Sequence, residues 1–403
     1  MVSWSEALEI IPGGNGLISK RPERYSLNKW PVYFSRAKGI EILGLDGNKY
    51  IDAAQMGIGT AILGYTNSEV DDAVKAAIDK GVNTTLNCPE EFLLAQKLIE
   101  LNPFAGGVKF TRSGGEAMAM AVRIARAFSG KDKIAFSGYH GWHDWYLSAN
   151  LGGDNLRHHL LSGVKPKGVP RGLKDTVFPF SYNDIEDLNR VINEEDIGTV
   201  IIEGARHEYP TQEFLTAIQN LCIEKNITII VDEITSGWRV TDGGVYKNFD
   251  FHPDIVVYGK GMGNGYAIAS VVGKKTIMDA AESTFISSTF WTERIGFVAA
   301  LKTLEILIEN KIYNHLNYIG NLIGEGWREL SQKHGIDLEV TDFKPLITFK
   351  YKGKNPQNFN QKFTERMLER GYLAAPSIYV SSFHDELFVE KYLENLDNVW
   401  SKK

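Results

Sequence analysis

The sequence predicts an α/β fold in which a mostly parallel sheet is wound between helices, and three observations support this. Short runs rich in Val and Ile recur through the middle of the chain without polar alternation, as expected of strands buried on both faces. Amphipathic helical segments lie between some of these runs. The 403 residues are also enough for two or three lobes around a large core.

The core of the expected sheet lies between residues 133 and 273. The strands predicted there are KIAFSG (133–138), GTVIIEG (198–204), NITIIVDE (226–233), PDIVVYG (253–259) and IASVVG (268–273). Helices are predicted at EAMAMAVRIARAFSG (116–130) and TQEFLTAIQNLCIEKN (211–226). In doubly wound sheets ligands bind at the carboxyl ends of the strands, so residues that follow these runs are the first candidates for a site.

The N-terminal part of the chain follows a different pattern. IEILGLDGNKYIDA (40–53) alternates apolar and polar residues around Asp46-Gly47, which predicts an antiparallel hairpin. Helical periodicity then predicts two helices, at 68–81 and 89–101.

The C-terminal part is predicted to be mainly helical after Thr292, with one strand at 345–351 and helices near 358–371 and 386–400. We therefore expect three parts, which are an N-terminal arm with the hairpin (1–60), a large domain (61–295) and a small C-terminal α+β domain (296–403) that packs with the arm.

Composition excludes several classes of function. A net charge of -6 and a pI near 5.9 argue against a nucleic-acid surface, because binding to phosphate backbones usually requires a basic excess. Cys88 and Cys222 lie far apart and form no metal or redox spacing, which fits a reducing cytoplasm. The first residues lack an export signal and no run of about 18 apolar residues occurs, so we expect a cytoplasmic protein without a membrane span.

Two polar stretches lie beside predicted strands or helices. Ser113-Gly114-Gly115 directly precedes a helix, where free N–H groups can bind an anion, although Ser113 can also serve simply as a helix cap. In SGYHGWHDWY (137–146), His140, His143 and Asp144 form an incomplete metal set. Tyr139 in the same stretch can form the wall of a pocket for a flat ligand or pack as an ordinary core tyrosine.

Carboxylates end two of the predicted strands. Asp232 and Glu233 follow one apolar run, and Glu203 ends another in the same way. Charges there are costly unless they are paired, and strand ends are where site residues gather. Helix capping by Asp232 is the alternative. The repetition of the pattern favours a site.

The stretch VVYGKGMGNGYAIASVVG (256–273) surrounds Lys260 with glycines but matches no phosphate-loop template. Lys260 is followed by Gly261, which rules out a Walker A loop, and the glycines alternate and lead into another strand instead of opening a helix. A lysine just past a strand, with glycines that leave room for a bulky planar group, is a candidate for Schiff-base chemistry.

Seven stretches together resemble the class III, fold-type I pyridoxal-phosphate (PLP) aminotransferases, and most closely the glutamate-1-semialdehyde 2,1-aminomutase branch. They are IPGG, LDGNKYID, SGGEAMAMAVRIARAFSGKDKI, GYHGWHD, VDEITSGWRV, HPDIVVYGKGMGNG and SSTFWTERIGFVAAL, in the family's order across residues 11–305. The resemblance implies PLP as cofactor and a homodimer whose site is shared between subunits.

The resemblance also implies roles for individual residues. Lys260 would hold PLP as an aldimine and later move the proton, and Asp232 would pair with the pyridine nitrogen. Tyr139 would stack on one face of the ring with Ile234 on the other. The remaining cofactor-binding candidates are Ser113, Gly114 and Gly115 for the phosphate, His140, Glu203 near the phenolic oxygen or substrate, and Ser288 and Thr289 from the neighbouring subunit.

The chain departs from the family pattern at two places that bear on function. The family commonly has threonine where this chain has Gly115, so one hydroxyl donor to the phosphate is missing. In the N-terminal arm, GGNGLISKRPERY replaces the usual serine and arginine that hold the substrate carboxylate. Ser19, Lys20 and Arg21 are the candidates for that task.

These observations predict an aminotransferase that moves an amino group from an amino-acid donor to a small carbonyl acceptor in ping-pong half-reactions. The alternative within the same class is the aminomutase, which moves the amino group inside one molecule to give 5-aminolevulinate. A phosphate-binding module or a hydrolase built on His140 and His143 would leave Asp232 and the ordered motifs unexplained. We expect no metal, nucleic acid or membrane partner.

Overall fold

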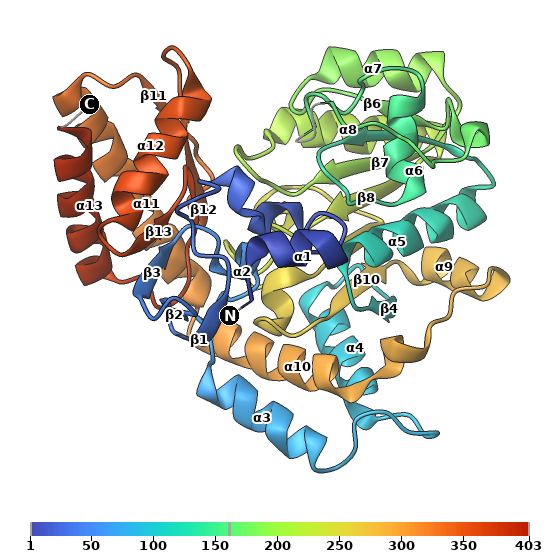
Figure 1. Cartoon of the computed structure of the whole chain (residues 1–403). Helices are drawn as coiled ribbons and strands as arrows, with labels where there is room; N and C mark the ends of the chain where they lie inside the picture. The colour runs from blue at the N-terminus through green and yellow to red at the C-terminus, as the bar shows by residue number, and fades with distance from the viewer. Residues whose placement is uncertain (1, 160–162, 402–403) are drawn as a thin grey trace. The chain divides into compact units, whose positions relative to one another are not determined.

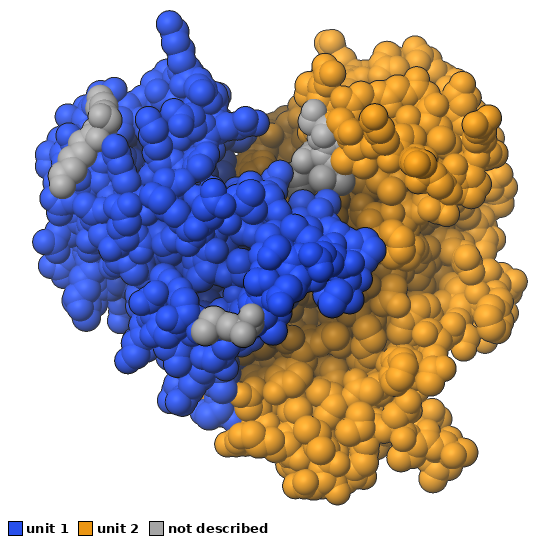
Figure 2. All heavy atoms as spheres, viewed as in Figure 1, with its two compact units in different colours: residues 1–68, 314–403 blue, residues 69–313 orange. Residues whose placement is uncertain are grey.

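The computed structural model describes residues 2–159 and 163–401 (Figure 1). The chain divides into two compact units, one made of residues 1–68 and 314–403 and the other of residues 69–313 (Figure 2). Within the described ranges, no helix is both long and apolar enough to cross a membrane.

A seven-stranded sheet forms the centre of residues 69–313, with the order β4-β10-β9-β8-β7-β5-β6. The strands from β9 to β6 in this order run parallel to one another, which confirms the expected α/β fold with a mostly parallel sheet. Their bounds are β4 Gly107–Thr111, β5 Lys133–Ser137, β6 Val177–Pro179, β7 Ile197–Glu203, β8 Thr228–Asp232, β9 Ile255–Tyr258 and β10 Ala269–Gly273.

All five predicted runs are strands, but the run at 268–273 differs in direction from the expectation. β10 is antiparallel to both of its neighbours, β9 and β4. Residues 259–268 are too few for the helical crossover that a parallel connection needs, so the chain reverses after Lys260. The edge strands β4 and β6 were missed because β4 is only half apolar and β6 is short and ends on Pro179.

Helices cover this sheet, and α5 lies along the strands β4, β7, β8, β9 and β10. Its buried face, which includes Met118, Ala121 and Ile124, joins the apolar core cluster of the sheet. The helices of this unit are α3 Ser68–Ile78, α4 Pro89–Leu101, α5 Gly114–Ser129, α6 Asp144–Leu147, α7 Ile185–Glu194, α8 Gln212–Lys225, α9 Lys275–Met278 and α10 Arg294–Glu309, which packs against α4.

The other unit contains two small sheets. The first has the order β1-β2-β3-β13 and includes the expected hairpin, whose strand β3 pairs in parallel with β13 from the C-terminal part. The second is antiparallel with the order β11-β12-β14. The strands are β1 Phe34–Lys38, β2 Glu41–Gly44, β3 Lys49–Ala53, β11 Leu338–Val340, β12 Leu346–Tyr351, β13 Tyr372–Ala374 and β14 Ser377–Tyr379.

Among its described residues, this unit also has four α-helices of seven or more residues and one of four residues. They are α1 Trp4–Ile10, α2 Met56–Gly59, α11 Ile312–His334, α12 Pro356–Leu368 and α13 Glu386–Trp400. The predicted helices at 358–371 and 386–400 and the strand at 345–351 are therefore confirmed, each to within a few residues. The three-residue strands β11, β13 and β14 are too short to leave a periodic signal in the sequence.

Candidate active site

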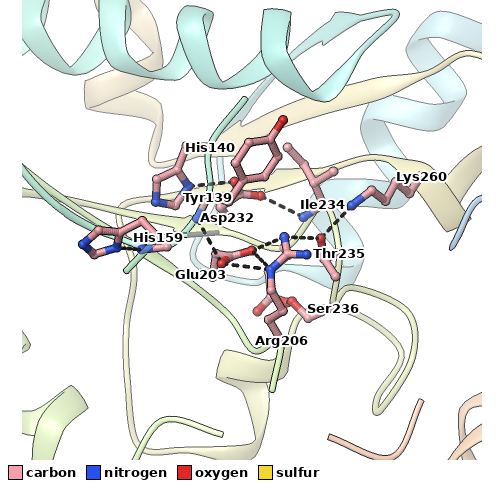
Figure 3. A network of polar contacts seen from close by, with 12 residues as sticks. Tyr139, His140, His159, Glu203, Arg206, Asp232, Ile234, Thr235, Ser236 and Lys260 are labelled. Carbon is pink, nitrogen blue, oxygen red and sulfur yellow. Dashed lines mark hydrogen bonds and ion pairs between the residues drawn. The ribbon is translucent and has the colours of Figure 1, made fainter. Parts of the chain in front are cut away.

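Four candidate residues come together because the strands that carry them are neighbours in the sheet. Tyr139 follows β5, Glu203 ends β7, Asp232 ends β8 and Lys260 follows β9, and these strands stand in the order β9-β8-β7-β5. The carboxyl ends of parallel strands meet at one edge of a sheet, so the four side chains share one region (Figure 3).

Asp232 is almost fully buried, with 4% of its surface exposed, and its carboxylate is held from two sides. Its Oδ1 accepts the N–H of Ile234 at 3.0 Å, and its Oδ2 lies 2.9 Å from Nδ1 of His140. The other ring nitrogen of His140 donates to the carbonyl of Ser137 at 3.2 Å. One nitrogen of His140 thus holds Asp232 and the other anchors the ring to the end of β5, which leaves none to bind a metal.

The position of Tyr139 depends on the glycine before it. Gly138 has a φ of +118°, and a Cβ there would lie 2.5 Å from Cγ of Glu203, so only glycine fits. The N–H of Tyr139 donates to Oε2 of Glu203 at 3.1 Å, while the hydroxyl of Tyr146 donates to the carbonyl of Gly138 at 2.8 Å. Burial raises the pKa of Tyr139, which keeps its phenol neutral.

A polar chain links Glu203 to Lys260 through two residues that the sequence did not single out. Arg206 donates to Oε1 of Glu203 from Nε at 2.9 Å and from Nη2 at 2.5 Å, and its Nη2 also donates to Oγ1 of Thr235 at 3.0 Å. Nζ of Lys260 donates to the same Oγ1 at 2.7 Å (Figure 3). Burial alone would raise the pKa of Glu203, but Arg206 outweighs it and the pKa is lowered.

The residues at the start of α5 both cap the helix and present free N–H groups, as expected for Ser113-Gly114-Gly115. Oγ of Ser113 accepts the N–H of Glu116 at 3.4 Å, and the Glu116 carboxylate accepts the N–H of Ser113 at 2.9 Å, which completes a capping box. Within the described residues, the N–H groups of Gly114 and Gly115 have no acceptor. A Cβ on Gly114 would lie 2.8 Å from Cδ1 of Ile234, so this turn lies against the side chain that was expected to cover the ring.

Arg112 connects this turn to the segment that carries Ser288 and Thr289. Its guanidinium donates to the carbonyls of Phe290 at 2.6 Å and of Trp291 at 3.3 Å, and also to that of Glu293. These carbonyls lie in and just after the 3₁₀ helix η8 (Thr289–Thr292). Ser288 and Thr289 are exposed, and within the described residues neither hydroxyl bonds to the strand-end residues.

The substrate candidates of the N-terminal arm belong to the other compact unit. Ser19 and Lys20 lie in a 3₁₀ turn (Ile18–Lys20) and Arg21 follows it. The carbonyl of Ser19 accepts the hydroxyl of Tyr25 at 2.7 Å. Their role in holding a carboxylate stays a prediction.

Glu233 is fully buried, and its carboxylate has other hydrogen-bond partners than that of Asp232. Its carboxylate accepts the hydroxyl of Ser236 at 2.5 Å and the N–H of Tyr246 at 3.2 Å. A Cβ on Gly204 or Gly244 would come within 2.6 Å of this carboxylate. Glu233 thus ties the turn after β8 to the segment at Tyr246, and it is a structural residue.

No group of three His, Cys, Asp or Glu side chains within residues 2–159 and 163–401 is arranged to hold a metal ion. Arg206 and Thr235 of the polar network were not predicted, and neither was Arg112, which contacts η8. Arg206 lies three residues after a strand-ending glutamate, which is the signal that could have identified it.

The sequence matches a known family over nearly all of its length. The model of the family described as aminotransferase class-III matches residues 24–396. A 3-aminobutyryl-CoA aminotransferase of Cloacimonas acidaminovorans (strain Evry) is 35% identical over an alignment of 362 residues, which covers 87% of this chain and 83% of that protein. A glutamate-1-semialdehyde 2,1-aminomutase of Campylobacter hominis is 31% identical over an alignment of 408 residues, which covers 96% of this chain and 89% of that protein.

Solved structures agree with this match. The PLP internal aldimine form of the Sphingopyxis sp. MTA144 FumI protein superimposes with a TM-score of 0.89 at 25% identity, over 99% of this chain and 95% of that one. An omega-transaminase from Sphaerobacter thermophilus superimposes with a TM-score of 0.87 at 24% identity, over 98% of this chain and 96% of that one. The chain belongs to the class III aminotransferases. It has the fold-type I architecture and PLP is its cofactor.

The residues present fit this cofactor. Lys260 supplies an amine, Asp232 a buried and oriented carboxylate, and Gly114 and Gly115 supply N–H donors without a partner in the described chain. The close approach of Gly114 to Ile234 leaves a cradle that a side chain would fill. An aldehyde, a protonated ring nitrogen and a phosphate are the groups that such donors and acceptors complement.

Changing Glu233 to Gln should alter how stability depends on pH. Burial raises the pKa of Glu233 from 4.5 to about 7, so the folded protein holds this proton more tightly than the unfolded chain. The resulting stabilisation is fully present below pH 4.5 and is lost as the pH rises through 7, a loss of about 3 kcal/mol. In Glu233→Gln, the free energy of unfolding measured with urea should no longer show this fall between pH 5 and pH 8. Glu224→Gln, on the exposed face of α8, should keep it; an unchanged pH profile in Glu233→Gln would contradict the assignment.

Removing the guanidinium of Arg112 should loosen η8. Arg112→Met keeps the apolar stem but removes the donors to four carbonyls, three of which belong to residues 290–293, and each bond is worth about 1.5–3 kcal/mol. Amide hydrogen exchange at residues 289–293 should become at least about tenfold faster. Arg123→Met removes a bond to a single carbonyl, that of Phe285, and should leave 289–293 unchanged. Equal exchange rates in the two variants would show that Arg112 does not hold this segment.

Proposed function

We propose that the protein is a PLP-dependent aminotransferase that moves an amino group from an amino-acid donor to a small carbonyl acceptor in two half-reactions. The convergence of Lys260, Asp232 and Tyr139 on neighbouring strand ends carries this proposal. Membership of the class III family supports the reaction class.

Pyridoxal phosphate, when bound, supplies an aldehyde that condenses with amines and a ring that withdraws electrons. Lys260 is the residue that would hold it covalently, and its amine, once released, is the group that moves a proton to or from the substrate carbon. Thr235 accepts a hydrogen bond from this amine and so orients its nitrogen.

The surrounding residues would hold the ring in one orientation. Asp232 would accept a hydrogen bond from the protonated pyridine nitrogen, and His140 and the N–H of Ile234 hold its carboxylate in place. Tyr139 would cover one face of the ring and the Ile234 side chain the other. Glu203 is placed by Arg206 next to Tyr139, on the side where a substrate or the phenolic oxygen would lie.

A specific observation also favours the aminomutase as a second candidate. Several glutamate-1-semialdehyde 2,1-aminomutases align with more than 95% of this chain at 28–31% identity. The similarity to a 3-aminobutyryl-CoA aminotransferase, at 35% identity, supports the aminotransferase instead, with a donor whose amino group is on the third carbon. Both chemistries use the same lysine and the same cofactor, so only substrates separate them.

The holoenzyme should transfer amino groups only when Lys260 is present. Its visible cofactor band should bleach with a suitable donor and return with an acceptor. The panel should contain α-amino acids, 3-aminobutyryl-CoA and glutamate 1-semialdehyde. Lys260→Ala should lose about 10²–10⁴-fold in rate, because the proton carrier is gone. It should also lose the borohydride-trapped cofactor adduct, whereas Lys275→Ala, an exposed lysine on α9, should keep both.

Two outcomes of that screen would refute the proposal. A cofactor adduct trapped at another lysine in Lys260→Ala would remove Lys260 from its role. Conversion of glutamate 1-semialdehyde to 5-aminolevulinate without any second amino acid would establish the aminomutase reaction in place of intermolecular transfer.

We further propose a homodimer in which Ser288 and Thr289 reach the cofactor phosphate of the partner subunit. Both residues are exposed, and Phe285 and Phe290 on either side of them are 84% and 65% exposed. Large apolar side chains at such exposure are typical of surfaces that another chain covers.

Polar replacement of these phenylalanines should weaken the dimer. Phe285→Ser combined with Phe290→Ser should raise the dimer dissociation constant at least about a hundredfold, because each buried phenylalanine contributes about 1.5–3 kcal/mol. Light scattering and sedimentation measure the mass. Ile223→Ser, which replaces a 72% exposed side chain on α8, is the control and should leave the dimer intact. A wild-type monomer at micromolar concentration would contradict the shared site.

A further inference from the structure

His143 has its ring at the N-terminus of α5, beside the residues expected to bind the phosphate. It is the N-cap residue of α6 and follows the turn that begins at Tyr139. If Gly115 carried a Cβ, that atom would lie 3.1 Å from Cδ2 and 3.3 Å from Nε2 of His143. The imidazole therefore occupies the space that a side chain at position 115 would need.

The backbone around His143 keeps its ring there. A Cβ on Gly141 would lie 3.1 Å from Cα of Gly115, and Gly141 has a φ of +104°, so the turn is pressed directly against the start of the helix. The ring of Trp142 also packs on the ring of His143, with centroids 4.6 Å apart. The imidazole has little freedom to move away from the helix end.

Nε2 of His143 is buried and has no hydrogen-bond partner among the residues that the structure describes. A buried polar nitrogen without a partner costs about 1–3 kcal/mol, so such atoms normally have one. Burial lowers the pKa of His143, while the carboxylates of Glu116 and Asp144 act in the opposite direction. A neutral ring protonated on Nε2 and a charged ring both present an N–H here.

Three unpaired donors thus meet at one helix end. The N–H groups of Gly114 and Gly115 have no acceptor in the described residues, and Nε2 of His143 lies beside them. The positive end of the α5 dipole also favours a negatively charged group at this helix end. Converging N–H donors at a helix N-terminus complement an anion with several oxygens, such as a phosphate monoester.

We propose that Nε2 of His143 donates a hydrogen bond to the phosphate of pyridoxal phosphate and takes the place of the hydroxyl that a threonine at position 115 would supply. The inference rests on the proposed position of the phosphate at Gly114 and Gly115. The two arrangements compete for the same space, because a Cβ at position 115 would press on the imidazole at 3.1 Å and force it to shift. His143, which the sequence suggested only as part of an incomplete metal set, thus becomes a phosphate ligand.

Binding measurements without turnover test this directly. Cofactor-free protein is titrated with pyridoxal phosphate and, separately, with pyridoxal, which lacks the phosphate. In His143→Leu the dissociation constant for pyridoxal phosphate should rise at least about tenfold, the usual effect of one lost bond to a charged group. The constant for pyridoxal should stay unchanged. His143→Gln, which retains an N–H at similar reach, should recover part of the affinity.

Controls separate ligand binding from folding and from the reaction. His252→Leu replaces an exposed histidine and should bind both compounds like the wild type. The melting temperature of each cofactor-free variant reports any structural damage. The assay involves no amino donor, so it gives its answer even if the proposed reaction is wrong. Equal weakening toward pyridoxal phosphate and pyridoxal, or no weakening at all, would overturn the proposal.

A reciprocal exchange provides a second test. Gly115→Thr alone should weaken the binding of pyridoxal phosphate, because the new side chain meets the ring of His143. Gly115→Thr combined with His143→Ala removes this collision and supplies a hydroxyl, so it should bind pyridoxal phosphate more tightly than either single variant. A double variant that binds no better than His143→Ala would contradict the assignment.

Discussion

The burial of charge at the carboxyl ends of β7 and β8 is the constraint on which the rest of the site depends. Glu203 and Asp232 lie in the same register of adjacent parallel strands and are almost inaccessible to water. Buried carboxylates stay ionised only when they are paired. Arg206 satisfies the first and His140 the second, and each partner is placed by its own strand end.

These two pairs divide the site into regions with different tasks. The Asp232 and His140 pair prepares a carboxylate for a ring nitrogen, and the Glu203 and Arg206 pair leads through Thr235 to the amine of Lys260. The phosphate region lies at the start of α5, where glycines bring the backbone close to Ile234 and His143. One sheet edge thus presents a carboxylate, an amine and an anion site at separate positions, as a flat phosphorylated cofactor requires.

Buried polar groups that have hydrogen-bond partners and those that lack them have different roles in this chain. Glu233 is fully satisfied by Ser236 and Tyr246, and it serves as a link between loops. Nε2 of His143 and the N–H groups of Gly114 and Gly115 lack partners in the described residues, and they point to a ligand. Adjacent residues such as Asp232, which ends β8, and Glu233, which follows it, can therefore have unrelated roles.

The sequence by itself determined the α/β class, the five central strands and the strand-end positions of Asp232, Glu203 and Lys260, because buried parallel strands leave continuous apolar runs and turns follow them directly. It also determined the capping box at Ser113, which is a local interaction. Only the tertiary structure decided the order of the strands and the antiparallel direction of β10. It also decided several partners of the charged and polar groups, since Arg112 and His143 act on residues that no local pattern connects with them, and Arg206 reaches Thr235 beyond the end of a neighbouring strand. Such pairings depend on which strands lie side by side, and the sequence holds no local signal for that.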